Sequence, residues 1–219
     1  MRYTQAELDR LTRDLYTAVL ADILDELGER DFCLSESLRP MKNSGKIMGY
    51  ARTLYAVDVF AVPEKPYQKD LEFLDSLTSG DVVVTTVNGN NHNGYIGELL
   101  STACLARGAR GCVLDGHARD LAFIDLAAFP IYCRGTNPLD SKGRVDAVSA
   151  DEPMLCGGVM VRPGDLIFAD EDGIVRIPAG RIGETIRLAT EKIRGENTVR
   201  EELRRGASVK ATFDKYGIL

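Results

Sequence analysis

Arg119 and Asp120 are adjacent and follow shortly after the apolar run GCVL, where a buried strand is expected to end. The planar guanidinium of arginine matches a substrate carboxylate, and aspartate supplies the hard oxygen ligand that Mg²⁺ or Mn²⁺ accepts. If both side chains line one cleft, they can hold a carboxylate beside a divalent cation. The same pair also fits a plainer role as solvated charges at the start of a helix, which is the commoner role of surface charges.

A second candidate region is the polar loop NGNNHNGY, which follows the apolar run VVVTTV. Gly94 and Gly97 in and after this loop precede a helix that is predicted to begin near Glu98. The free N–H groups and the positive dipole end of such a helix suit a carboxylate or a phosphate. A simple turn into a helix accounts for the same residues.

The two histidines, His92 and His117, flank the same predicted cleft. A zinc site needs three or four protein ligands, so this pair does not indicate one. We expect His117 to line the cleft and His92 to lie in the loop, and acid–base chemistry stays open for both. The chain contains no G-x-S-x-G, G-x-G-x-x-G or phosphate-loop motif. The sequence therefore does not indicate a hydrolase triad or a nucleotide-binding loop.

The elements that must position these residues alternate between strands and helices. The predicted order is a strand at VVVTTV, a helix over 96–107, a strand at GCV, a helix over 118–127 and a strand at PIYCRG. This order indicates βαβ units and a mostly parallel sheet. Ligands bind beyond the carboxyl ends of such strands, where both candidate regions fall. Asp115 is expected to cap the helix over 118–127.

The flanking segments complete an α/β chain. Thr4 and Glu7 fit a capping box at the start of the first helix, and Thr17 could cap a second helix that ends at Gly28. The other predicted elements are strands within 45–60, a short helix over 71–77, a β-rich second sheet or barrel-like layer after 143 with a turn at Asp170–Gly173, and an amphipathic helix over 179–205. One domain over 1–219 is the simplest organisation.

Composition narrows the function classes. The net charge of −6 gives no general attraction to phosphate backbones, so nucleic acid is not an expected partner. The sequence has no run of about 18 apolar residues, so no membrane span is expected. The first residues carry no apolar leader region. The five cysteines include no C-x-x-C pair, which favours reduced cysteines in a cytoplasmic protein.

Glu98, a gap of 20 residues and then Arg119-Asp120 form a pattern that resembles a known family. The pattern stands among TAVLADILDELG, IGELLSTACLARGARGCVLDGHARD, FPIYCRGTNP and VRPGDLIFADEDGIVRIP, in that order. Together these segments are similar to the metal-dependent 4-hydroxy-4-methyl-2-oxoglutarate aldolases. That family also contains the regulator of ribonuclease E activity A, RraA, and proteins once labelled menaquinone methyltransferases. The resemblance covers nearly the whole chain.

The resemblance implies an α/β fold with a swivelling β/β/α-type layered core and a site at a subunit interface of a homotrimer or a dimer of trimers. It implies that Asp120 is the direct metal ligand and that Arg119 anchors the substrate. The backbone of Gly97, Glu98, Leu99 and Leu100 would receive a pyruvyl carboxylate, and Glu98 would act through water on the metal. Glu196, from a neighbouring subunit, is the best match to an acidic residue that completes such sites.

The activity implied is Mg²⁺-dependent, or Mn²⁺-dependent, cleavage of 4-hydroxy-2-oxo acids such as 4-hydroxy-4-methyl-2-oxoglutarate. Oxaloacetate would lose CO₂ through the same pyruvate enolate. The alternative is a non-catalytic regulator that binds a ribonuclease E-type partner, but Glu98, Arg119 and Asp120 are all present, which favours the enzyme. The loop DGHARD places His117 where the family often has a small residue, so His117 is expected to affect the acceptor half of the pocket.

Overall fold

The computed structural model describes residues 2–90 and 92–217, so Asn91 of the predicted polar loop lies outside the described residues. The helices are α1 (Gln5–Asp14), α2 (Thr17–Glu26), α3 (Gln68–Asp75), α4 (Glu98–Ala106), α5 (Ile182–Arg204) and α6 (Val209–Tyr216), with short 3₁₀ turns at Leu121–Phe123 and Ala179–Arg181. The strands are β1 (Arg39–Pro40), β2 (Ile47–Asp58), β3 (Asp81–Thr86), β4 (Gly94–Ile96), β5 (Cys112–Ala118), β6 (Ile131–Thr136), β7 (Val145–Ala150), β8 (Met154–Cys156), β9 (Val159–Val161), β10 (Leu166–Asp170) and β11 (Gly173–Ile177).

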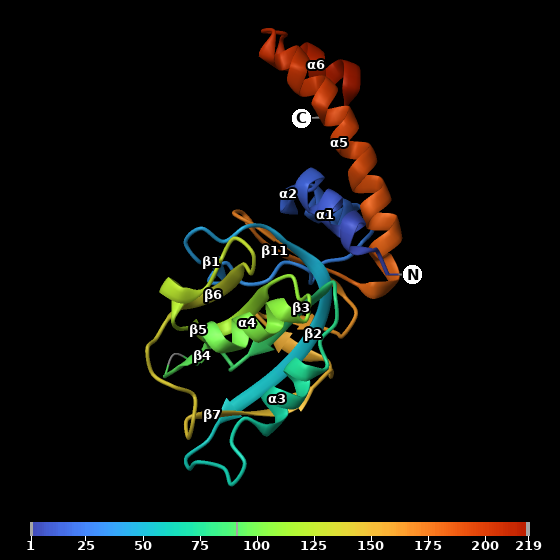
Figure 1. The fold of residues 1–219 in the computed structure, drawn as a ribbon. Helices are drawn as coiled ribbons and strands as arrows, with labels where there is room; N and C mark the ends of the chain where they lie inside the picture. Colours follow the sequence, from blue (N-terminus) through green and yellow to red (C-terminus); the bar gives the residue numbers. More distant parts are fainter. Residues whose placement is uncertain (1, 91, 218–219) are drawn as a thin grey trace.

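Nine strands of the described chain form one mixed sheet (Figure 1). Its main path runs β1-β6-β5-β3-β2-β10-β11, while β4 pairs with β5 and β7 pairs with β2. The centre is parallel, because β2, β3, β5 and β6 pair in the same direction. The flanking strands β1, β7, β10 and β11 pair antiparallel. The predicted parallel core is therefore confirmed, and it is extended on both sides by antiparallel strands.

The central strand β3 is buried along its whole length, as its continuous apolar sequence predicts. On one face of the sheet, a core cluster includes Phe73 and Leu74 of α3 and Cys104 of α4. On the other face, Met154 and Val159 of the small β8–β9 sheet pack over the strands. The layered α/β architecture is thereby confirmed, with helices on one side and a β layer on the other.

The N-terminal and C-terminal helices cover another part of the sheet, at β2, β10 and β11. Residues of α1 and α2 such as Leu8 and Leu20 pack with Phe168 of β10 and with Ile186 and Ala189 of α5. Beyond this contact α5 extends outward from the sheet and carries α6 near its far end (Figure 1). The capping box of α1 is confirmed. The helix α6, which the sequence analysis did not predict, follows from a Ser208 cap.

Three sequence predictions need correction. The segment 118–127 is not a helix, because β5 continues to Ala118 and only a 3₁₀ turn follows. Thr17 is the first helical residue of α2 rather than its cap. The β-rich segment after 143 does not form a separate large sheet: β7, β10 and β11 join the main sheet, and only β8 and β9 stand apart.

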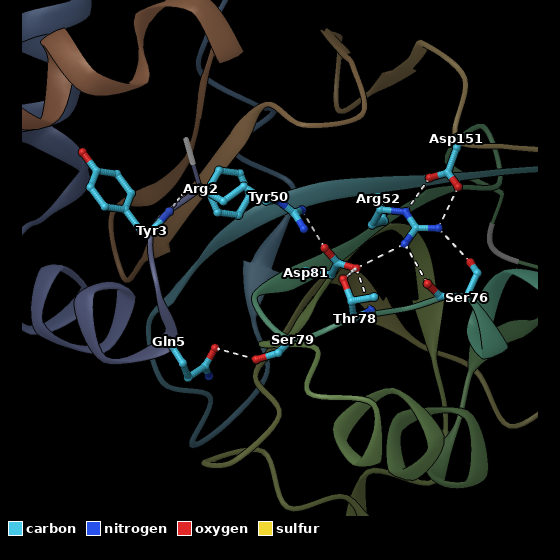
Figure 2. Close-up of polar contacts among 10 residues, drawn as sticks. All are labelled: Arg2, Tyr3, Gln5, Tyr50, Arg52, Ser76, Thr78, Ser79, Asp81 and Asp151. Atoms are coloured by element: carbon cyan, nitrogen blue, oxygen red, sulfur yellow. Dashed lines mark hydrogen bonds and ion pairs between the residues drawn. The ribbon is translucent and has the colours of Figure 1, made fainter.

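A buried carboxylate ties the N-terminal segment to the sheet (Figure 2). Asp81, at the start of β3, accepts hydrogen bonds from Arg2 at 2.7 Å and from Arg52 of β2 at 3.2 Å. Figure 2 shows that the Arg52 guanidinium also donates hydrogen bonds to Asp151 and to Ser76, which follows α3. The network therefore fixes the carboxyl end of α3, a helix that lines the cavity described below.

Replacing Asp81 by alanine is expected to lower the free energy of unfolding by about 3 kcal/mol, because two arginines lose a buried partner. The Asp81 side chain has no solvent exposure. Asp25→Ala is the matched control, since its partner Arg30 lies on the surface and the Asp25 side chain is 55% exposed. That control is expected to lose less than about 1 kcal/mol. Urea unfolding measures both, and equal losses would contradict the role of burial.

The cysteines are unpaired in this fold. Cys33 is exposed, while Cys104, Cys112, Cys133 and Cys156 are buried. Burial raises the pKa of Cys104 to about 12, so this thiol packs as a small apolar group. Among the residues described, no helix combines the length and the apolar character that a membrane crossing requires.

Candidate active site at the carboxyl ends of three strands

A cavity of about 230 Å³ lies where β4, β5 and β6 end. Gly97 follows β4, Arg119 and Asp120 follow β5, and Asp140 lies in the loop after β6. The residues that line it are Tyr67, Asp70, Leu71, Tyr95, Gly97, Leu99, Leu100, Arg119, Asp120, Asp140 and Ser141. Because these strands are parallel, their carboxyl ends meet at one edge, which is the place where α/β sheets bind ligands.

Arg119 and Asp120 are held in one wall of this cavity. Asp120 adopts a left-handed backbone conformation, with φ at 58°, directly after β5. Aspartate tolerates this conformation better than most residues. The Asp120 carboxylate oxygen Oδ2 lies 3.5 Å from Nε of Arg119 and 3.5 Å from the backbone nitrogen of Glu98. The predicted juxtaposition of Arg119, Asp120 and the start of α4 is therefore present in the fold.

The N-terminus of α4 forms the adjacent wall. Gly97 has no side chain to cap α4, and the first helical N–H, that of Glu98, makes a long contact of 3.5 Å to Asp120 Oδ2. The cavity is lined here by Gly97, Leu99 and Leu100. The Glu98 side chain turns along the helix and accepts a hydrogen bond from Thr102 at 3.0 Å. Of the predicted set 97–100, Gly97, Leu99 and Leu100 line the cavity, whereas Glu98 does not.

Asp140 and Tyr67 form a hydrogen-bonded pair that also lines the cavity. The Tyr67 hydroxyl donates to Asp140 at 2.8 Å, and Nη2 of Arg119 lies 3.3 Å from the other Asp140 oxygen. Burial acts to raise the pKa of Asp140, but the Tyr67 hydrogen bond and the Arg119 charge outweigh it and hold the pKa below its usual value. Tyr67 has φ at 64°, an uncommon conformation for a bulky residue.

Asp70 and Tyr95 form a second pair at the base of the cavity. The Tyr95 hydroxyl donates to Asp70, and both residues are buried. Burial raises the pKa of Asp70. Burial and the neighbouring Asp70 carboxylate raise the pKa of Tyr95 well above its ordinary value. Tyr95 therefore keeps its proton and uses it in this contact.

Three residues singled out in the sequence lie away from this cavity. His117 sits within β5, and its Nδ1 is 3.3 Å from the backbone oxygen of Asn90. Asp115 does not cap a helix: it is buried in β5, where it accepts hydrogen bonds from Arg134 and from the backbone of Gly157. Glu196 lies on α5, where Tyr16 donates to it. Within one chain, neither His117 nor Glu196 lines the cavity.

The donor set of the cavity fits a weakly held Mg²⁺-type cation rather than a protein-enclosed metal. The Asp120 carboxylate is 44% exposed and has only long contacts, so its oxygen atoms remain free for a cation. No group of three or more histidine, cysteine, aspartate or glutamate side chains is placed to hold a metal within 2–90 and 92–217. One carboxylate suits Mg²⁺, which keeps several other oxygen ligands from water or substrate.

Four residues of the cavity were not predicted from the sequence: Tyr67, Asp70, Tyr95 and Asp140. Asp140 could have been found by the argument already applied to Arg119, because it follows the next parallel strand and must meet the same edge of the sheet. Tyr67 and Asp70 gave no comparable signal, since the segment PEKPYQKD reads as a loop before a short helix. Only the tertiary fold brings them to the cavity.

Comparisons with known proteins identify the family of this chain. The family model described as RraA-like, Aldolase/RraA, matches residues 17–176. A protein of Halalkalibacterium halodurans named "Putative 4-hydroxy-4-methyl-2-oxoglutarate aldolase" is 32% identical over 193 residues, which cover 86% of each chain.

Solved structures share the fold as well. A crystal structure of an uncharacterized protein from Pseudomonas syringae is 25% identical with a TM-score of 0.84 and covers 99% of this chain and 96% of its own. Streptomyces coelicolor RraAS2, described as an unusual member of the RNase ES inhibitor RraA protein family, is 29% identical with a TM-score of 0.77 and covers 91% of this chain and 98% of its own. The chain therefore belongs to the RraA-like family, as the order of its sequence motifs predicted.

Proposed function

We propose that this protein is a divalent-metal-dependent pyruvate aldolase that cleaves 4-hydroxy-2-oxo acids and decarboxylates oxaloacetate. One observation carries the proposal: Arg119, Asp120 and the uncapped start of α4 converge on a single cavity. This convergence provides a cation ligand, a guanidinium and free backbone N–H groups within reach of one small molecule. The relatives named as aldolases support the same class of reaction.

The chain's own groups account for binding and orientation of a 2-oxo acid. The substrate carboxylate binds at the first N–H groups of α4, where the helix dipole favours a negative charge. Arg119 lies beside it and stabilises the negative charge that develops on the 2-oxo oxygen. The cavity restricts the rest of the molecule, so that the bond between C3 and C4 is held in a reactive orientation.

The bond changes balance without a further reactant. The C4 hydroxyl loses its proton and becomes a carbonyl, while the electron pair of the C3–C4 bond passes into the pyruvate enolate. A proton then returns to C3 and completes pyruvate. For oxaloacetate, the departing fragment is CO₂ and the enolate is the same.

Mg²⁺, or Mn²⁺ or another divalent cation, would be held by Asp120 and would supply Lewis-acid stabilisation of the enolate charge.

In this proposal Glu98 positions water for proton transfer near the cavity, and Glu196 of a neighbouring subunit completes the site in a homotrimer or a dimer of trimers. In the single chain Glu196 accepts a hydrogen bond from Tyr16 and lies 3.7 Å from Arg200, with its side chain 18% exposed, so this role requires it to exchange these partners in the assembly. His117 would act on the acceptor half only indirectly, through the loop at Asn90.

The test is release of pyruvate from 4-hydroxy-4-methyl-2-oxoglutarate and from oxaloacetate, with Mg²⁺ and with EDTA. We expect release with Mg²⁺, loss of at least about 90% of the rate in EDTA, and recovery when Mg²⁺ is restored. A blank without protein is essential for oxaloacetate, because the cation alone promotes its decarboxylation. Equal rates of pyruvate release in EDTA and in Mg²⁺ would contradict the proposed metal dependence.

A second candidate function is regulation of a ribonuclease E-type partner. The observation in its favour is the similarity to RraAS2, which is described as belonging to an RNase ES inhibitor family. Co-purification with a ribonuclease E-type scaffold distinguishes the two. A stable complex together with no pyruvate release would favour the regulator.

A further inference from the structure

The cavity has an uneven charge distribution. Of the described residues that line it, Arg119 is the single cationic side chain, whereas Asp70, Asp120 and Asp140 carry carboxyl groups. A substrate with one carboxylate needs one anion-binding end, and the start of α4 with Arg119 provides it. A substrate with two carboxylates needs a second such end.

Arg119 cannot serve that second end, because it belongs to the first end and its guanidinium also contacts two carboxylates. Its Nε lies 3.5 Å from Asp120, and its Nη2 lies 3.3 Å from Asp140. The Asp140 side chain is 40% exposed, so it faces the space that a bound molecule would enter. A second substrate carboxylate in this space would meet an ionised aspartate whose positive partner is already engaged.

The neutral hydrogen-bond donors are engaged as well. A tyrosine hydroxyl has a single proton to donate. Tyr67 gives its proton to Asp140 at 2.8 Å, and Tyr95 gives its proton to Asp70. Ser141, the other hydroxyl of the lining, is buried. The part of the cavity around Asp140 is therefore rich in acceptors and poor in free donors.

The remaining lining is apolar. Leu71 and Leu99 are 54% and 78% exposed, which is unusual for large apolar side chains, and Leu100 lies beside them. Exposed leucines at a cavity are placed to cover an apolar part of a bound molecule. These leucine side chains have no charge and no hydrogen-bond donor with which to bind a second carboxylate.

We propose that Asp140 makes the enzyme selective for 4-hydroxy-2-oxo acids with a single carboxylate, whose fragment beyond C4 is uncharged and has an apolar body. This inference rests on the proposed function and specifies its substrate class. The products would be pyruvate and a neutral aldehyde or ketone. The bond changes are those given above, with no further reactant. Dicarboxylic substrates such as 4-hydroxy-4-methyl-2-oxoglutarate would be cleaved less efficiently, not excluded.

The experiment compares two substrates that differ only at the distal group. 4-Hydroxy-2-oxopentanoate carries a methyl group on C4, and 4-hydroxy-2-oxoglutarate carries a carboxylate there. We expect kcat/KM to favour the pentanoate by about tenfold or more in the unaltered protein. Asp140→Asn removes the charge and keeps the shape, and it is expected to reduce this preference about tenfold. The ratio of the two substrates is the readout because any loss from a shifted Arg119 affects both.

Asp75→Asn is the matched control, since Asp75 pairs with Arg107 outside the cavity. It is expected to leave the ratio unchanged. A preference for the dicarboxylate in the unaltered protein, or a ratio that Asp140→Asn leaves unchanged, would overturn the role of Asp140 while leaving the aldolase intact. Failure to cleave either substrate would instead overturn the proposed function, and the inference with it.

Discussion

Asp120→Asn is expected to lower the Mg²⁺-dependent kcat/KM for pyruvate release by about 10³-fold, which corresponds to about 4 kcal/mol of transition-state stabilisation. Asparagine keeps the size of the side chain and tolerates the left-handed backbone that Asp120 adopts at φ 58°. It removes the negative charge, however, and an amide oxygen is a much weaker ligand for a hard cation. The loss therefore reports the charge of Asp120 and not a disturbed turn.

Two further measurements separate this role from a general defect. Asp151 also has a positive φ, at 55°, and also pairs with an arginine, so Asp151→Asn is a matched control outside the cavity. It is expected to keep pyruvate release within about twofold, as surface substitutions usually do. Mg²⁺ together with pyruvate should raise the Tm of the unaltered protein and of Asp151→Asn, but not of Asp120→Asn. Full Mg²⁺-dependent turnover in Asp120→Asn would refute the assignment of Asp120 as the metal ligand.

The fold around the cavity was predictable where sequence pattern and tertiary structure agree. The run VVVTTV forms β3, buried on both faces, and the helix predicted over 96–107 is α4 at Glu98–Ala106. Both predictions depend on strong local signals: a continuous apolar strand and an apolar helical stripe ended by Gly108. Parallel pairing of these strands then placed the loops after them at one edge of the sheet.

The helix predicted over 118–127 failed for a reason that acts over long range. The composition of this segment favours a helix, with three alanines and two leucines. In the fold, Ala118 pairs with Ile96 of β4 and Thr136 of β6, which holds the chain extended to that point. Asp120 then takes a left-handed conformation that no continuing α-helix contains. Pairing with neighbouring strands thus overrides local propensity, at the position where the candidate metal ligand is placed.

The candidate site also combines residues that local sequence pattern predicts with residues that only the tertiary fold brings to the cavity. Arg119 and Asp120 could be identified because they follow a predicted strand and match a family spacing. Tyr67 and Asp70 could not, because they approach the cavity only through the packing of α3 against the sheet. Sequence reasoning therefore found the anion-binding end and missed the acidic half opposite it. That half is the part which decides between substrates in our proposal.

Gly97→Ala is expected to lower kcat/KM by about 10²-fold while the protein stays folded. The backbone at Gly97, with φ at −126° and ψ at −171°, is accessible to alanine, so no strain arises from the main chain. An added Cβ would lie 2.6 Å from Oδ2 of Asp120 and 3.1 Å from Nε of Arg119. Both side chains must therefore move, and a displacement of about 1 Å in such groups is enough for a loss of this size.

The matched control is Gly183→Ala near the start of α5, where an added Cβ meets nothing within 4 Å. It is expected to keep activity and to gain up to about 1 kcal/mol of stability from helix propensity. If Gly97→Ala kept full activity, the close approach of Gly97 to Asp120 and Arg119 would have no part in catalysis. If it lost activity with an unchanged Tm, the defect would be one of position, since the charges of Asp120 and Arg119 are both still present. That second result would show that the site depends on where the sheet edge and the start of α4 hold these two groups, beyond their chemical identity.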